Sequence, residues 1–245
     1  MTEDIRLNSS NWDNFYKVEI TNFKANPEDT GECWFDDSDA ELKMIEFLIA
    51  KINNYELPFT TTAEKPITIV DLGTGNGHLL FQLREDIEEE IEVPEIQFNF
   101  HGIDYSEDSV AFAQSIKDNK YEDNNQFQFD QVNLLEKDSK FILEHEYDVL
   151  LDKGTLDAIA LNQEGMAEFD NEIGMNVYAK QVEQMMHTNS IFLITSCNFT
   201  EEELIKIVVG NTKGSLEVWD KINYPSFRFG GVQGSTICSI AFIKK

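Results

Sequence analysis

The sequence contains few basic residues for its length. It has 19 Lys plus Arg against 46 Asp plus Glu, and the formal net charge is -27 at pH 7. A negative field of this size repels phosphate backbones and anionic lipid surfaces, so nucleic acid and membranes are disfavoured as direct partners. A basic protein surface would instead be attracted and steered. Equally, the acidity could serve only to keep the protein soluble.

Cysteine is also scarce. Cys33, Cys197 and Cys238 are odd in number, lie far apart, form no CxxC pair and have no matching group of histidines. We therefore expect reduced thiols and no metal site. The sequence has no run of about 18 apolar residues and no basic stretch followed by an apolar one at its start. These absences predict a soluble cytosolic or nuclear protein.

The composition that remains is that of a globular α/β protein, with 41% hydrophobic and 11% aromatic residues. Strand and helix patterns alternate along most of the chain, which predicts a parallel sheet with crossover helices. The expected strands are 66–71, 97–104, 126–132, 147–152, 190–196, 215–224 and 235–243, and the expected helices include 39–54, 77–90, 106–119 and 172–187. The last two strands have no helix-length segment between them, so we expect an antiparallel hairpin that closes the sheet.

Two helix starts carry the spacing of a capping box. Ser38 is followed by Glu41, and Thr200 is followed by Glu203. The chain of 245 residues suits one main domain, which we expect at residues 38–245. Residues 1–37 hold too many aromatic side chains for a flexible tail, so we expect this N-terminal extension to pack on the domain. These aromatics are Trp12, Phe15, Tyr16, Phe23, Trp34 and Phe35.

The most informative stretch is VDLGTGNGHLL at residues 70–80, where Gly73, Gly75 and Gly77 alternate directly after an apolar strand. A glycine-rich turn from strand to helix lets the backbone approach a ligand closely and presents free N–H groups. Dinucleotide-binding folds show G-x-G-x-x-G, whereas this loop reads G-x-G-x-G. Asp71 before the first glycine suits S-adenosylmethionine, which has no pyrophosphate to repel it and carries an ammonium group. The loop therefore favours a methyl-donor site.

Further residues at strand ends extend this expected site. Asp104 ends the second strand, where a carboxylate accepts hydrogen bonds from both hydroxyls of a ribose. Asn133 follows the third strand, and in such folds a residue at this position contacts the adenine. The expected cofactor-binding set is Trp34, Asp71, Gly73, Thr74, Gly75, Gly77, Asp104, Tyr105, Asn133 and Leu134. The alternative for each is structural, since glycine turns occur in any α/β protein and aspartates at strand ends often cap helices.

Longer blocks carry a family resemblance that spans nearly the whole chain. They read TGECWF (30–35), VDLGTGNGHLL, YDVLLDKGTLDAIAL (147–161), FLITSCNFT (192–200) and FGGVQGSTICSIAF (229–242). The sequence resembles the class I, seven-strand S-adenosylmethionine-dependent methyltransferases, and among them the eukaryotic lysine methyltransferases that modify translation elongation factor 1A. Asn133 departs from the family, whose members carry an acid at that position.

The resemblance implies a Rossmann-like α/β fold, with a seven-stranded sheet in the order 3-2-1-4-5-7-6, strand 7 antiparallel and helices on both faces. It also implies methyl transfer from S-adenosylmethionine to a lysine of elongation factor 1A, a basic protein, by a cytoplasmic monomer. Asp152 ends the fourth strand, where this fold usually meets its substrate, and is the expected catalytic residue that orients the amine. Lys153 is expected to be a salt-bridge partner or a backbone brace rather than a methyl acceptor, and Asp157 is expected to brace the same loop.

Other functions stay open at this point, because the fold alone does not choose a substrate. The chain has no Pro-Pro after Asn or Asp and no cysteine after proline, which weakens the adenine and cytosine methyltransferase readings. A methyltransferase of another basic protein remains an alternative. So does a cofactor-binding adaptor in translation or vesicle trafficking.

Overall fold

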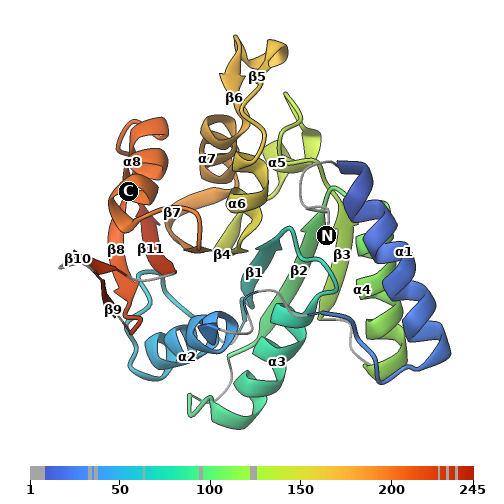
Figure 1. Cartoon of the computed structure of the whole chain (residues 1–245). Coiled ribbons are helices and arrows are strands. Elements are labelled where there is room, and N and C mark those ends of the chain that lie inside the picture. Colours follow the sequence, from blue (N-terminus) through green and yellow to red (C-terminus); the bar gives the residue numbers. More distant parts are fainter. Residues whose placement is uncertain are drawn as a thin grey trace.

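A computed structural model describes residues 9–32, 35, 38–62, 64–93, 96–121, 126–225, 227–229, 232–234 and 237–245. At its centre is a seven-stranded sheet in the order β3-β2-β1-β4-β7-β11-β8 (Figure 1). These strands are β1 (Ile67–Leu72), β2 (Phe98–Asp104), β3 (Phe127–Gln131), β4 (Tyr147–Lys153), β7 (Met186–Ser196), β8 (Leu216–Ile222) and β11 (Cys238–Lys244). β11 pairs antiparallel with both β7 and β8, and the other neighbours are parallel. Counted along the chain the order is 3-2-1-4-5-7-6, so the expected fold is confirmed.

Helices cover both faces of the sheet. They are α1 (Ser9–Ala25), α2 (Ala40–Asn53), α3 (His78–Glu90), α4 (Glu107–Lys120), α5 (Lys140–Glu144), α6 (Thr155–Ala160), α7 (Gly174–Gln184) and α8 (Glu201–Asn211). Strand side chains alternate between the two faces, so Ile69 packs with α1 to α4 while Val70 packs with α5 to α8. A small hairpin of β5 (Gly165–Met166) and β6 (Glu172–Ile173) precedes α7, with the short η3 (Ala167–Phe169) between its strands. None of the helices within the described ranges is long and apolar enough to cross a membrane.

The N-terminal extension forms α1 and lies on the outside of α4 (Figure 1). Tyr16 and Phe23 from α1 are both 6% exposed and join the core under α4. The Phe23 ring meets the edge of Phe112 with 5.7 Å between centroids. α1 thus packs on the main unit, while the division into an N-terminal extension at residues 1–37 and a domain at residues 38–245 stays a prediction.

One of the two expected capping boxes is present. Thr200 and Glu203 bond reciprocally at the start of α8. The box at Ser38 and Glu41 is wrong, because Asp39 precedes α2 with a φ of 52° and gives no side-chain cap. Glu41 turns inward and is only 8% exposed. The segment between β8 and β11 also differs from a plain turn, since β9 (Phe227–Phe229) and β10 (Val232–Gly234) pair as a second small hairpin.

Candidate active site

The glycine loop joins β1 to α3 at the carboxyl edge of the sheet. Gly73, Gly75 and Gly77 have φ angles of 73°, 59° and 80°, a left-handed conformation that glycine adopts without strain. The N–H groups of Gly73 and Thr74 donate to the Ile103 carbonyl at 2.8 and 2.9 Å, which fixes the loop against β2. Thr74 itself is buried at 6% exposure. The expected turn is thus present, with its backbone held in one shape.

Each glycine also allows a close approach by another part of the chain. A Cβ added at Gly73 would lie 2.1 Å from the Thr155 hydroxyl of α6, and one added at Gly75 would lie 2.8 Å from the Tyr16 hydroxyl of α1. Thr155 donates its hydroxyl hydrogen to the Leu72 carbonyl at the end of β1. The loop is therefore enclosed by α6 on one side and α1 on the other.

Asp104 lies at the end of β2 and faces the loop. Its carboxylate accepts hydrogen bonds from the N–H groups of Gly75 at 3.1 Å and Ser106 at 3.0 Å. The side chain is buried, and burial raises the pKa of this carboxyl group while the two N–H donors lower it. The Ser106 hydroxyl donates to Asp13 of α1 at 2.7 Å. Asp104, the residue expected to bind the ribose, thus lies beside the loop and beneath α1.

The residues expected near the adenine lie at the ends of β2 and β3, and their contact with an adenine stays a prediction. Asn133 is exposed, and its Oδ1 accepts a hydrogen bond from the Leu135 N–H at 3.0 Å. Leu134 is 6% exposed and Tyr105 is 38% exposed. Gln131 donates to the Tyr105 carbonyl at 2.9 Å, which holds the ends of β2 and β3 together. Trp34, also expected here, lies outside the described residues.

A cluster of charged and titratable side chains lies next to the loop at the ends of β1 and β4, with Glu41 and Lys153 largely buried and His78 partly exposed. Glu41 of α2 pairs with Lys153 at 3.3 Å and with His78 at 2.5 Å. Burial raises the pKa of the nearby Asp71 to about 7, the charge of Lys153 opposes this, and Glu41 adds to it. Lys153 is thus an ion-pair partner, as expected. Sequence reasoning missed Glu41 and His78, because the only signal at Glu41 matched a helix cap.

Asp152 at the end of β4 is 0% exposed. It accepts hydrogen bonds from the Thr155 N–H at 2.7 Å, the Leu156 N–H at 3.1 Å and the Tyr178 hydroxyl at 2.6 Å. Burial raises the pKa of the Asp152 carboxyl group to about 7, although these donors lower it. The carboxylate therefore anchors the start of α6. Its contact with a substrate amine stays a prediction.

Asp157 connects α6 to the end of β7. Its carboxylate accepts hydrogen bonds from the Ser196 hydroxyl at 2.5 Å and the Cys197 N–H at 2.8 Å. These hydrogen bonds join the block at residues 147–161 to the block at residues 192–200, so both motifs lie at one edge of the site. No cluster of three or more His, Cys, Asp or Glu side chains able to hold a metal occurs in the described part of the chain. The expected absence of a metal stays a prediction.

Known proteins share this arrangement. Residues 63–231 match the family model of a methyltransferase domain. Among solved structures, the magnesium protoporphyrin IX methyltransferase of Synechocystis with bound S-adenosylmethionine aligns with a TM-score of 0.53 at 14% identity, over 94% of this chain and 97% of that one. A TehB-like methyltransferase from Corynebacterium glutamicum aligns with a TM-score of 0.55 at 12% identity, over 97% and 100%. The family match over residues 63–231 identifies a methyltransferase, and the solved structures share its fold.

Curated relatives narrow the class. Protein-lysine N-methyltransferase EFM4 of Saccharomyces cerevisiae is 46% identical over 234 residues, which cover 96% of this chain and 92% of that protein. EEF1A lysine methyltransferase 2 of Homo sapiens is 29% identical over 235 residues, 95% of this chain and 84% of that protein. The chain belongs to this family of protein-lysine N-methyltransferases. The resemblance seen in the sequence is confirmed.

Proposed function

We propose that the protein transfers a methyl group from S-adenosylmethionine to a lysine side chain of translation elongation factor 1A. The observation that carries this proposal is the 46% identity to the EFM4 methyltransferase over 96% of the chain. Relatives from Danio rerio and Homo sapiens, at 30% and 29% identity, bear the elongation factor in their names.

The residues at the strand ends fit the adenosyl part of the cofactor. Gly73, Gly75 and Gly77 leave backbone without side chains at the loop. The Asp104 oxygens each hold more than one lone pair, so the carboxylate can accept ribose hydroxyls as well as its two N–H donors. Asn133 supplies an amide oxygen for the adenine amino group. When bound, S-adenosylmethionine supplies an electrophilic methyl group on a sulfonium cation.

The chain itself must hold a lysine amine in its neutral form beside that methyl group. An ordinary lysine has a pKa of about 10.4, and desolvation lowers the pKa of an amine. Positioning and exclusion of water by the loops after β4 and β7 are therefore the main tasks of the protein. We assign Asp152 to this positioning. Its carboxylate holds the start of α6 and would accept a hydrogen bond from the amine of the bound lysine.

Replacing Asp152 tests that assignment. Asp152→Asn keeps the size of the side chain but removes the charge, and we expect kcat to fall at least about tenfold with little change in S-adenosylmethionine affinity. Tyr178→Phe is the matched control, since it removes one donor to Asp152 and leaves the carboxylate. It is expected to cost about 1–3 kcal/mol of stability and to keep most of kcat. If both variants lose kcat in parallel with stability, Asp152 only anchors α6.

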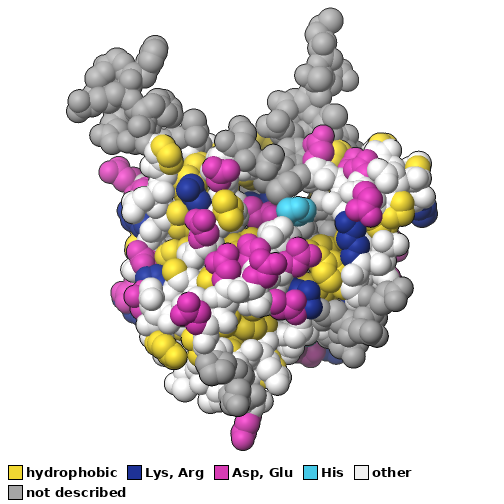
Figure 2. Space-filling model, turned by 90° about the horizontal axis from the view of Figure 1, so that it is seen from below, with side chains coloured by type: hydrophobic (Ala, Val, Ile, Leu, Met, Phe, Trp, Pro, Cys, Tyr) yellow, Lys and Arg dark blue, Asp and Glu magenta, His cyan; other side chains and the backbone are white. Residues whose placement is uncertain are grey.

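The surface charge suits a basic partner. Figure 2 shows a face on which Asp and Glu side chains outnumber Lys and Arg, in line with the net charge of -27. Such a field attracts a basic protein substrate and repels nucleic acid. We propose a cytoplasmic enzyme that acts as a monomer on the folded elongation factor and does not bind nucleic acid directly.

Cells without this protein give a test of the substrate. Mass spectrometry of elongation factor 1A from such cells is expected to show the loss of methylation at one lysine, with the other methylated lysines unchanged. Return of the wild-type gene should restore the methyl group. An elongation factor with an unaltered methylation pattern would instead favour another basic protein as substrate, or an adaptor role.

A further inference from the structure

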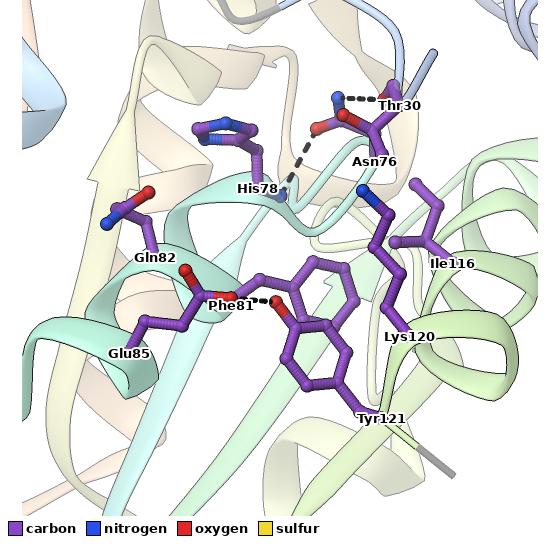
Figure 3. A pocket seen from close by; sticks show the side chains of 9 residues that line it. All are labelled: Thr30, Asn76, His78, Phe81, Gln82, Glu85, Ile116, Lys120 and Tyr121. Atoms are coloured by element: carbon purple, nitrogen blue, oxygen red, sulfur yellow. Dashed lines mark hydrogen bonds between the residues drawn. The ribbon is translucent and has the colours of Figure 1, made fainter. Parts of the chain in front are cut away.

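Two sequence motifs that lie far apart in the chain meet at Asn76. This residue stands between Gly75 and Gly77 in the cofactor loop. Its Nδ2 donates to the carbonyl oxygen of Thr30 at 2.9 Å, and its Oδ1 accepts from the His78 N–H at 3.2 Å (Figure 3). The same Nδ2 also donates to the carbonyl oxygen of Glu32 at 3.3 Å. Both amide hydrogens and the amide oxygen are therefore in use. Thr30 and Glu32 belong to the TGECWF block, of which only Trp34 was expected at the cofactor site, and Trp34 lies outside the described residues.

We propose that Asn76 is a positioning residue that ties the N-terminal segment (residues 9–32) to the cofactor loop, so that this segment forms the outer wall of the adenosyl site. The inference rests on the proposed function, because it concerns the binding of S-adenosylmethionine. It assigns a task to Asn76, between the last two glycines of the loop, and to the carbonyl oxygens of Thr30 and Glu32.

The N-terminal segment is shaped to meet Asn76. Gly31 has a φ of 85°, a conformation that favours glycine. A Cβ at this position would lie 2.6 Å from the Glu19 carboxylate and 3.1 Å from the Phe112 ring. The bend at Gly31 lets the carbonyl oxygens on both sides of it, those of Thr30 and Glu32, reach one amide. A residue with a side chain at position 31 would disturb this arrangement.

The tied segment covers the groups expected to hold the adenosyl part. Tyr16 of α1 is 6% exposed, and its hydroxyl lies close to Gly75. Burial raises the pKa of Tyr16, and the negative charge of Asp104 raises it further. Asp13 accepts the hydrogen bond from Ser106, which itself donates to Asp104. The segment thus lies against the ribose candidate Asp104, and cofactor binding is expected to depend on its position.

The chain offers a matched pair of variants. Asn76→Asp keeps an oxygen for the His78 N–H at the start of α3, where a negative charge is favourable, but it replaces both donors with acceptors that repel the two carbonyl oxygens. Asn53→Asp is the control, because Asn53 also donates to a carbonyl, that of Glu90, and accepts from an N–H, that of Glu92. Asn53 is the last residue of α2, and its partner Glu90 lies at the end of α3 opposite the loop.

The experiment measures S-adenosylmethionine affinity by titration calorimetry, and hydrogen exchange of the 26–32 amides in the free protein. For Asn76→Asp we expect affinity about tenfold weaker, the effect of losing one or two hydrogen bonds, and faster exchange. Asn53→Asp should keep the S-adenosylmethionine affinity and the exchange rates of the 26–32 amides within about twofold of wild type. Wild-type affinity and exchange in Asn76→Asp, or equal effects in both variants, would overturn the inference. A wild-type protein that binds no S-adenosylmethionine would contradict the proposed function itself. The hydrogen-exchange data would still test whether Asn76 holds the N-terminal segment in place.

Discussion

Replacing Gly75 with arginine is expected to abolish S-adenosylmethionine binding, with affinity lowered by more than about 100-fold, a cost of roughly 3 kcal/mol. Gly75 has a φ of 59°, and a residue with a Cβ pays roughly 1–2 kcal/mol to adopt such a conformation. The added Cβ would also lie 2.8 Å from the Tyr16 hydroxyl. The rest of the arginine side chain would have to displace α1 or enter the space beside Asp104. Titration calorimetry measures the affinity directly.

The control for this variant is Gly210→Arg. Gly210 lies on α8, and a Cβ added there meets nothing within 4 Å. Arginine is also a better helix former than glycine. Gly210→Arg should therefore keep wild-type affinity and stability. A Gly75→Arg protein that folds and still binds the cofactor as tightly as Gly210→Arg would show that the loop does not hold it.

Replacing Asp104 with alanine is expected to weaken S-adenosylmethionine binding by about 100-fold, since hydrogen bonds to a charged group contribute roughly 1.5–3 kcal/mol. The variant loses the acceptor for the ribose hydroxyls and leaves the N–H groups of Gly75 and Ser106 without this partner. Asp104→Asn keeps one acceptor oxygen, so a smaller loss is expected. The cofactor dissociation constant and the melting temperature should be measured together.

A second buried aspartate separates loss of affinity from loss of stability. Asp148 is 3% exposed and lies near the amino-terminal end of β4. Its carboxylate accepts hydrogen bonds from the Thr68 N–H at 2.8 Å and from His187 at 2.9 Å. Asp148→Ala should lower the melting temperature as much as Asp104→Ala but leave the affinity of the folded protein unchanged. Equal loss of affinity in both variants would contradict the ribose role of Asp104.

The sheet and the loop were predictable because their signals are local. Buried strands such as 66–71 and amphipathic helices such as 106–119 repeat with periods that the chain geometry imposes. The alternating glycines required left-handed backbone, which all three adopt. The missing helix between the last two strands predicted their antiparallel pairing. Asp104 and Asn133 followed once the strand ends were known, because parallel strands end at one edge of the sheet.

The contacts that complete the site were not predictable, since they join distant segments through tertiary packing. Glu41 matched a helix cap by spacing, yet it pairs with His78 and Lys153. Tyr16 was counted only as an aromatic that packs on the domain, and nothing in its neighbourhood indicated that its hydroxyl meets Gly75. Asp152 lies at the end of the fourth strand as expected, but the sequence did not indicate that the Tyr178 hydroxyl of α7 donates to it.

Transfer of labelled methyl from S-adenosylmethionine to purified elongation factor 1A, by the purified protein alone, is the most direct measurement. We expect label on one lysine of the elongation factor with the wild-type protein and with Gly210→Arg, and none with Gly75→Arg. Absence of label from the elongation factor, from a panel of basic proteins and from a cell lysate would contradict the assignment as a protein-lysine methyltransferase.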